Sequence, residues 1–74
     1  MTQLEFWDQK ADGVVANIRL REPGILPSVG DLVYVPDEKD SGVYAYVKVL
    51  YRRFYYSQSG ELIMIRLACE MMSQ

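Results

Sequence analysis

The side chains that could perform covalent chemistry in this sequence lack the partners that such chemistry needs. The chain has one cysteine, Cys69, and no histidine. A serine or thiol nucleophile normally depends on a neighbouring base, most often histidine, to take its proton. Cys69 also falls on an alternating apolar row within residues 61–72, which predicts a buried, unreactive thiol. We therefore expect no nucleophilic catalysis from Cys69 or from the serines, which are Ser28, Ser41, Ser57, Ser59 and Ser73.

The carboxylates and glycines are equally weak candidates for acid–base, metal or phosphate sites. Asp37, Glu38 and Asp40 surround Lys39 in a polar stretch, where solvent keeps carboxylates ionised. One thiol without histidine cannot build a cysteine-rich zinc site, and the acidic stretch lacks the spacing of a calcium loop. The glycines stand singly, so no phosphate-binding glycine loop is present. We expect that the chain is not an enzyme and binds no metal or cofactor.

The most distinctive stretch is residues 43–56, VYAYVKVLYRRFYY, which holds five of the six tyrosines of the chain. Aromatic platforms flanked by arginine bind single-stranded nucleic acid by stacking the bases. Tyrosine also favours strands and pairs with its neighbours across them, so a purely structural role and a protein contact are alternatives. The candidate nucleic-acid residues are Lys48, Arg52, Arg53 and Tyr55.

Composition weakens the nucleic-acid interpretation. The 74 residues carry a net charge of −2, and the sequence pI is about 4.9, whereas nucleic-acid-binding domains typically show a strongly basic patch. No run approaches the ~18 apolar residues of a membrane span. The first residues do not follow the basic-then-apolar pattern of a signal peptide. Together with the free cysteine, these features predict a cytoplasmic protein that does not contact a membrane.

Alternation of apolar and polar residues predicts one all-β domain over residues 1–74. The Asp12-Gly13 pair is a hairpin signal, because both residues tolerate a positive φ. The following connector, residues 22–30, holds two prolines and two glycines, and its Ile25 and Leu26 are expected to plug the domain. The expected strands are residues 3–7, 14–21, 31–35, 43–56 and 61–69.

The expected fourth strand is long and changes phase part-way. Its apolar row stands at odd positions from Val43 to Tyr51, but the large side chains beyond Arg52 stand at even positions. One inserted residue produces such a slip, which predicts a bulge or sharp bend between Leu50 and Arg53. The fifth strand is expected to end as a strand, with a short helical turn as the alternative. Its expected core row is Ile63, Ile65, Leu67, Cys69 and Met71.

The segment LPSVGDLVYVP, residues 26–36, resembles the entry to a strand in SH3-like barrels. In that pattern Gly30 permits the turn and Asp31 accepts hydrogen bonds from nearby backbone N–H groups. The resemblance covers residues 26–72 and implies a small, five-stranded, strongly bent antiparallel barrel. The ALYDY-like motif of peptide-binding SH3 domains is absent, so specificity for proline-rich peptides is not implied.

The last expected hairpin carries apolar side chains on both of its sides, whereas an 8.6 kDa monomer has one interior. Monomers rarely expose large contiguous apolar patches, and Tyr, Trp, Met and Arg are enriched in interfaces. We therefore expect a non-catalytic protein-interaction module that forms a homo-oligomer or binds another protein. Nucleic-acid binding and a small-molecule pocket, at an oligomer seam or at the mouth of the barrel, are the alternatives. The expected interface residues are Trp7, Tyr44, Tyr46, Leu62, Met64 and Arg66.

Overall fold

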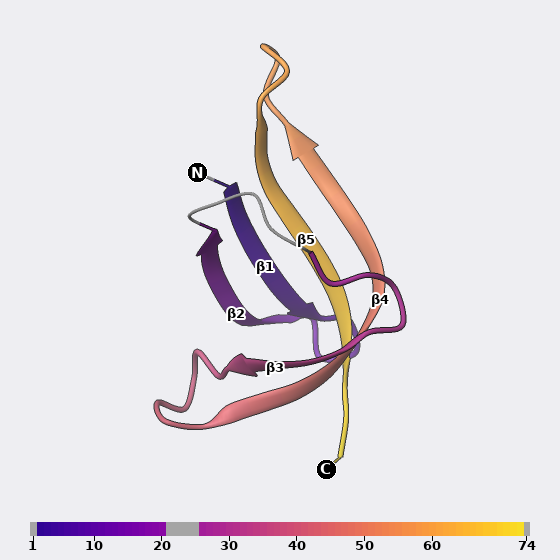
Figure 1. Ribbon diagram of the computed structural model, residues 1–74. Coiled ribbons are helices and arrows are strands. Elements are labelled where there is room, and N and C mark those ends of the chain that lie inside the picture. Colours follow the sequence, from indigo (N-terminus) through magenta and orange to yellow (C-terminus); the bar gives the residue numbers. More distant parts are fainter. Residues whose placement is uncertain (1, 21–25, 74) are drawn as a thin grey trace.

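The computed structural model describes residues 2–20 and 26–73, which form five β-strands (Figure 1). These ranges contain no helix, and so none that is long and apolar enough to cross a membrane. The predicted all-β, five-stranded class is confirmed, and the last strand continues to Met71 in place of the alternative helical turn. The strands are β1 (Thr2–Asp8), β2 (Gly13–Leu20), β3 (Leu32–Pro36), β4 (Tyr44–Tyr56) and β5 (Leu62–Met71).

The five strands form one bent sheet in the order β2-β1-β5-β4-β3. Neighbouring strands are antiparallel except for β1 and β5, which run parallel. This corrects the expectation of an antiparallel barrel throughout. Each connection reverses the chain, so the first and fifth strands point the same way when they meet. The edge strands nearly close the barrel, because the N–H of Glu38 donates to the carbonyl of Val15 at 2.9 Å.

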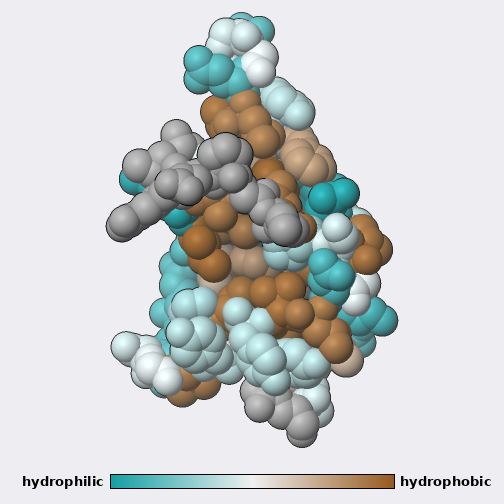
Figure 2. All heavy atoms as spheres, viewed as in Figure 1, coloured by the Kyte–Doolittle hydropathy of each residue, from teal (hydrophilic) through white to brown (hydrophobic). Residues whose placement is uncertain are grey.

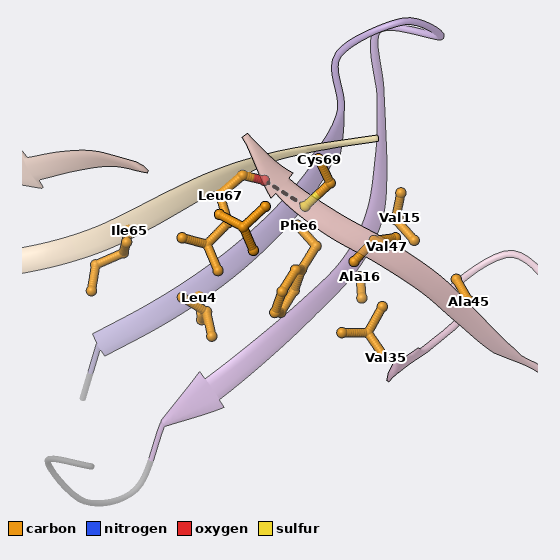
Figure 3. Close-up of a cluster of buried hydrophobic side chains, with 11 residues drawn as sticks. Leu4, Phe6, Val15, Ala16, Val35, Ala45, Val47, Ile65, Leu67 and Cys69 are labelled. Atoms are coloured by element: carbon orange, nitrogen blue, oxygen red, sulfur yellow. Dashed lines mark hydrogen bonds between the residues drawn. The ribbon is translucent and has the colours of Figure 1, made fainter. Parts of the chain in front are cut away.

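The core lies on the inner side of the sheet, with the Phe6 ring among the side chains of the other strands (Figure 3). Burial of this apolar surface is the main force that holds so small a sheet together. Cys69 is fully buried, as predicted, and its thiol donates to the Leu67 carbonyl at 3.2 Å. The buried cluster is Leu4, Phe6, Val15, Ala16, Val35, Ala45, Val47, Val49, Ile65, Leu67 and Cys69.

A β-bulge at Leu50 confirms the predicted change of phase in β4. Val49 pairs with Cys69 and Tyr51 pairs with Ala68, so Leu50 is the extra residue on β4. The bulge lies at the first residue of the predicted interval. Before it, the odd residues of β4 face the core; after it, the even residues take the core side. One strand therefore presents different sets of side chains to the same outer surface along its length.

The ends of the predicted core rows lie outside the core. Ile63 and Met71 of β5 and Val43 before β4 are exposed. A second register shift places Tyr55 opposite Met64 and Tyr56 opposite Leu62, so Ile63 has no partner on β4. Met71 lies beyond the last residue of β5 that pairs with β1. Alternation alone assigned these residues to the core because it cannot show where a bulge occurs or where a neighbouring strand ends.

The connector before β3 confirms the local geometry that the SH3-like pattern implied. Gly30 has a φ of 92°, which side chains with a Cβ rarely adopt. The carboxylate of Asp31 accepts a hydrogen bond from the N–H of Ser28 at 2.7 Å. Leu26 packs against the core cluster as predicted. Ile25, and the last residue of the predicted second strand, Arg21, lie outside the described residues.

Candidate protein-interaction surfaces

The outer side of β1, β5 and the second half of β4 carries a surface that we call the arginine–aromatic face. The strand registers create it: Glu5 of β1 lies beside Arg66 of β5, and Arg66 lies opposite Arg53 of β4. The next row joins Trp7, Ala68 and Tyr51 in the same way. Ala68 is fully buried although it is on the outer side. The face is defined by Trp7, Tyr51, Arg53, Tyr55 and Arg66.

A buried ion pair organises the centre of this face. Glu5 is buried, and one of its carboxylate oxygens accepts a hydrogen bond from Nε of the half-buried Arg66 at 2.5 Å. The Arg66 guanidinium also lies over the Trp7 ring, 5.4 Å from its centroid. Glu5 thereby offsets the repulsion expected between Arg66 and Arg53, which oppose each other across the strands.

Arg53 is the exposed cation of the arginine–aromatic face. Its guanidinium lies 5.7 Å from the centroid of the Tyr51 ring. A hydrogen-bonding contact with Tyr55, with further contributions from the charges of Tyr55 and Tyr51, raises the pKa of Arg53 above its ordinary value. No acidic side chain forms an ion pair with Arg53 within residues 2–20 and 26–73. Its charge is therefore free to meet an anionic or aromatic group from outside the chain.

A second surface, the tyrosine face, covers the outer side of β3 and the first half of β4. Tyr34 lies opposite Tyr46, and their rings stack with centroids 4.5 Å apart and planes inclined by 21°. Pro36 lies opposite Tyr44 at one end of the pair. Tyr34 is 58% exposed and Tyr44 is 61% exposed, so the stack leaves much of the tyrosine surface in water. The face is defined by Leu32, Tyr34, Tyr44 and Tyr46.

A third surface, the distal patch, lies on the second half of the β4–β5 ribbon, whose tip extends past the other strands (Figure 1). Figure 2 shows hydrophobic atoms along this part of the ribbon, below its polar turn. Phe54 and Tyr56 take the core side of β4 after the bulge, where Phe54 lies opposite the buried Ile65 and Tyr56 lies opposite Leu62. They are 41% and 62% exposed, and Ile63 of β5 is 50% exposed. Arg52 is exposed on the same side of β4, with its guanidinium 5.6 Å from the centroid of the Phe54 ring. The patch is defined by Phe54, Tyr56 and Ile63.

The six residues expected to form one interface lie in three places. Trp7 and Arg66 belong to the arginine–aromatic face, and the half-buried Met64 lies beside it, opposite Tyr55. Tyr44 and Tyr46 belong to the tyrosine face, beyond the Leu50 bulge. Leu62 does not share the outer row as expected, because the shift at Ile63 turns it to pack against the core. Leu62 is therefore the one member of the six that lies off the outer side of the sheet.

The four nucleic-acid candidates are separated in the same way. Arg53 and Tyr55 lie together on the arginine–aromatic face. Arg52 points to the other side of β4. Lys48 lies before the bulge and is paired with Glu70 of β5. An acidic neighbour thus offsets Lys48, and the four residues do not lie on one face.

Sequence reasoning missed several exposed aromatic residues. Tyr34 stands in a short strand, where its stacking partner Tyr46 is not visible from the sequence. Phe54 and Tyr56 have large aromatic side chains, which favours assigning them to the core. They are exposed because β3 pairs with β4 only as far as Lys48, which the sequence does not show. The phase change after Leu50 was a usable signal, since it places Tyr51 and Tyr55 on the same outer side of β4 as Tyr44 and Tyr46.

Among the described residues, the cysteine is buried and no cluster of metal ligands is found. Burial raises the pKa of the Cys69 thiol to about 11, the opposite of what a reactive thiolate needs. No group of three potential metal ligands is found in residues 2–20 and 26–73. Two surface hollows have volumes of about 130 and 230 Å³, which are below the 300–1,000 Å³ that is usual for ligand pockets. The larger hollow lies at the bulge, lined by Gln9, Lys10, Leu50, Cys69 and Glu70.

Comparison with known proteins finds no matching family model, no matching curated protein and no matching solved structure. The support for a function therefore comes from the side chains of the chain itself. Their most prominent feature is the set of exposed aromatic rings at both ends of β4.

Proposed function

We propose that this chain is a non-catalytic protein-interaction module with an SH3-like small barrel, and that it self-associates. One observation carries the proposal: aromatic side chains are exposed at both ends of β4. Tyr44 at one end and Tyr56 at the other each have more than half of their surface in water. Aromatic residues are enriched where proteins contact one another, because they bury much apolar area and keep a polar group for hydrogen bonding.

In so small a chain, an exposed interface would be a large fraction of the surface. A standard interface buries roughly 800 Å² on each partner, about a seventh of the 5292 Å² surface of this chain. A domain of this size has a small core, and a partner subunit is one of the usual ways to add stability. Disulfides within the chain are excluded by the single cysteine.

The SH3-like assignment rests on the nearly closed five-stranded sheet and on the turn before β3. Gly30 and Asp31 supply the positive φ and the carboxylate–backbone bond that the pattern implied. The assignment brings no peptide specificity with it, since the motif of peptide-binding SH3 domains is absent. The proposed interface is therefore argued from exposure and chemistry alone.

Sedimentation velocity over a range of protein concentrations tests the proposal. We expect a mass of two or more copies at micromolar concentration, falling towards 8.6 kDa on dilution. Because aromatic contacts dominate the proposed interface, the association should persist when salt is raised. A sample that stays at 8.6 kDa at every concentration refutes self-association.

Single-stranded nucleic-acid binding is the second candidate, and the arginine–aromatic face favours it. Arg53 lies beside Tyr51 and Tyr55, which is the combination that stacks bases beside phosphates. The pairing of Arg66 with Glu5 and the acidic pI count against it. This candidate predicts retardation of single-stranded DNA or RNA at low salt, which weakens as salt rises and is reduced by Arg53→Gln. Absence of retardation at low salt eliminates it.

A further inference from the structure

The edge of β4 is open along its second half. β3 pairs with β4 only from Tyr44 to Lys48, and the backbone of Val49 is bonded to Gly30 and Asp31. From Tyr51 to Tyr56, β5 lies on one side, and no strand among the described residues lies on the other (Figure 1). An open strand edge offers unpaired N–H and C=O groups to another chain.

The backbone groups that point to this edge can be assigned from the bonds on either side of the bulge. The carbonyl of Tyr46 accepts from Met72 of β5, whereas the N–H of Val49 donates to Asp31 on the other side. Groups on an antiparallel strand alternate between its two neighbours. The extra residue at Leu50 shifts the alternation by one. The N–H and C=O groups of Arg52, Phe54 and Tyr56 therefore point to the open edge.

We propose that residues 52–56 pair antiparallel with the same residues of a second copy, about a twofold axis at Phe54. Phe54 then lies opposite the partner's Phe54, Arg52 opposite the partner's Tyr56, and Arg53 opposite the partner's Tyr55. This inference rests on the proposed self-association and specifies the partner, the strand edge that pairs and the register of the pairing. Two five-stranded sheets join into one continuous sheet.

Symmetry and charge select this register. Residues opposite each other share a face of the sheet, so the twofold axis must pass through a residue position. An axis at Arg53 would place two arginines directly opposite each other, which is unfavourable. An axis at Tyr55 would leave three residues for pairing, because β4 ends at Tyr56. The axis at Phe54 pairs five residues and places every arginine opposite a tyrosine.

The side chains of β4 already show the contacts that this register would extend. Arg52 and Arg53 each lie against an aromatic ring within their own protomer, at 5.6 and 5.7 Å. Across the axis, each guanidinium would meet a second ring, from the partner's Tyr56 or the partner's Tyr55. The exposed Phe54 and Tyr56 rings would be covered by the same event. Pairing would therefore give hydrogen-bond partners to the open backbone edge and would cover part of the distal patch at the same time.

Cysteine cross-linking tests the register directly. The cysteines are introduced into the Cys69→Ala variant, which removes the native thiol. Opposite Cα atoms in an antiparallel pair are about 4.5–5.5 Å apart, within the range of a disulfide. Phe54→Cys should therefore cross-link to itself under mild oxidation. Two Arg53 Cα atoms would be about 8 Å apart in this register, beyond disulfide reach. Arg53→Cys should fail to cross-link alone but should do so when mixed with Tyr55→Cys. Cross-linking of Arg53→Cys alone, without that of Phe54→Cys, overturns the register.

A charge substitution separates this inference from the proposed function. Phe54→Lys places two lysines opposite each other and should return the protein to the monomer mass, with an unchanged circular dichroism spectrum. Tyr44→Lys is the matched control, because Tyr44 is at least as exposed on the other end of the same strand. If Tyr44→Lys dissociates the assembly and Phe54→Lys does not, the protein self-associates elsewhere and the inference is wrong. If the wild type is already a monomer at every concentration, both the inference and the proposed self-association fail.

Discussion

Replacing Glu5 with glutamine tests whether the arginine–aromatic face is held together by one carboxylate. Glu5 is buried beneath the outer surface and pairs with Arg66, whose side chain is 28% exposed. Glutamine has nearly the same shape but carries no charge. In Glu5→Gln the guanidinium of Arg66 would remain in place, opposite Arg53, without its counter-charge.

The magnitude follows from the burial of the pair. Removing one partner of a fully buried ion pair costs about 3–5 kcal/mol. Arg66 keeps some contact with solvent, so we expect Glu5→Gln to lower the free energy of unfolding by about 2–3 kcal/mol. A 74-residue domain has a total of roughly 4–11 kcal/mol. Since 1 kcal/mol shifts the melting temperature of such a domain by about 4–8 °C, the expected drop is roughly 10–20 °C.

Thermal and urea unfolding of the wild type, Glu5→Gln, Arg53→Gln and the double variant measures both the loss of stability and its cause. Arg53→Gln alone should be nearly neutral or slightly stabilising, because it removes the charge that opposes Arg66. Combined with Glu5→Gln, it should recover part of the lost stability. If Glu5→Gln costs less than about 0.5 kcal/mol, the range of an exposed pair, the ion pair is not organising the face. If Arg53→Gln adds its own cost to that of Glu5→Gln, the repulsion argument is wrong.

Three further predictions concern the scaffold. Phe6→Ala should cost about 3–5 kcal/mol in urea unfolding because the ring is fully buried, and a loss below 1 kcal/mol would contradict its central place in the core. Gly30→Ala should cost about 1–2 kcal/mol because of its φ of 92°, whereas Gly13→Ala, where no positive φ is required, should be nearly neutral. Equal losses in the two glycine variants would refute the strain argument. The pKa of Cys69 is raised from 9.0 to about 11, so the unfolded thiol ionises first and stability falls as pH rises from about 9 to 11. Cys69→Ala should lack that alkaline component, and an unchanged pH profile would show that the thiol does not contribute it.

Local patterns in the sequence were sufficient to predict the strands, the turn at Gly30 and the phase change in β4. These features depend on residues close together in the chain, such as Asp31 and Ser28, or on alternation within one strand. The bulge was visible because Phe54 and Tyr56 stand at even positions after an odd-numbered apolar row. Such signals need no knowledge of which strands are neighbours.

The composition of the surfaces could not be predicted, because it depends on neighbours that are distant in sequence. Glu5 is polar and alternates outward, yet it is buried because the parallel register with β5 brings Arg66 beside it. Tyr34 and Tyr46 stack because β3 pairs with β4 in one register and not another. Leu62 was expected outside because the sequence carries no sign of the irregularity at Ile63.

The bulge at Leu50 connects the fold to the proposed assembly. Without it, the register of Val49 with Cys69 would continue, Arg53 would lie opposite Ile65 on the core side, and Phe54 would join the outer row with Tyr44 and Tyr46. With it, Arg53 and Tyr55 remain outside, and the backbone groups of Phe54 turn to the open edge. The same extra residue therefore keeps Arg53 on the outer side of the sheet and sets which register a second copy can adopt. A β-bulge usually disfavours edge pairing by twisting the strand. Here the bulge at Leu50 lies before the open stretch, and the second irregularity has its extra residue, Ile63, on β5, so residues 52–56 of β4 keep their alternation.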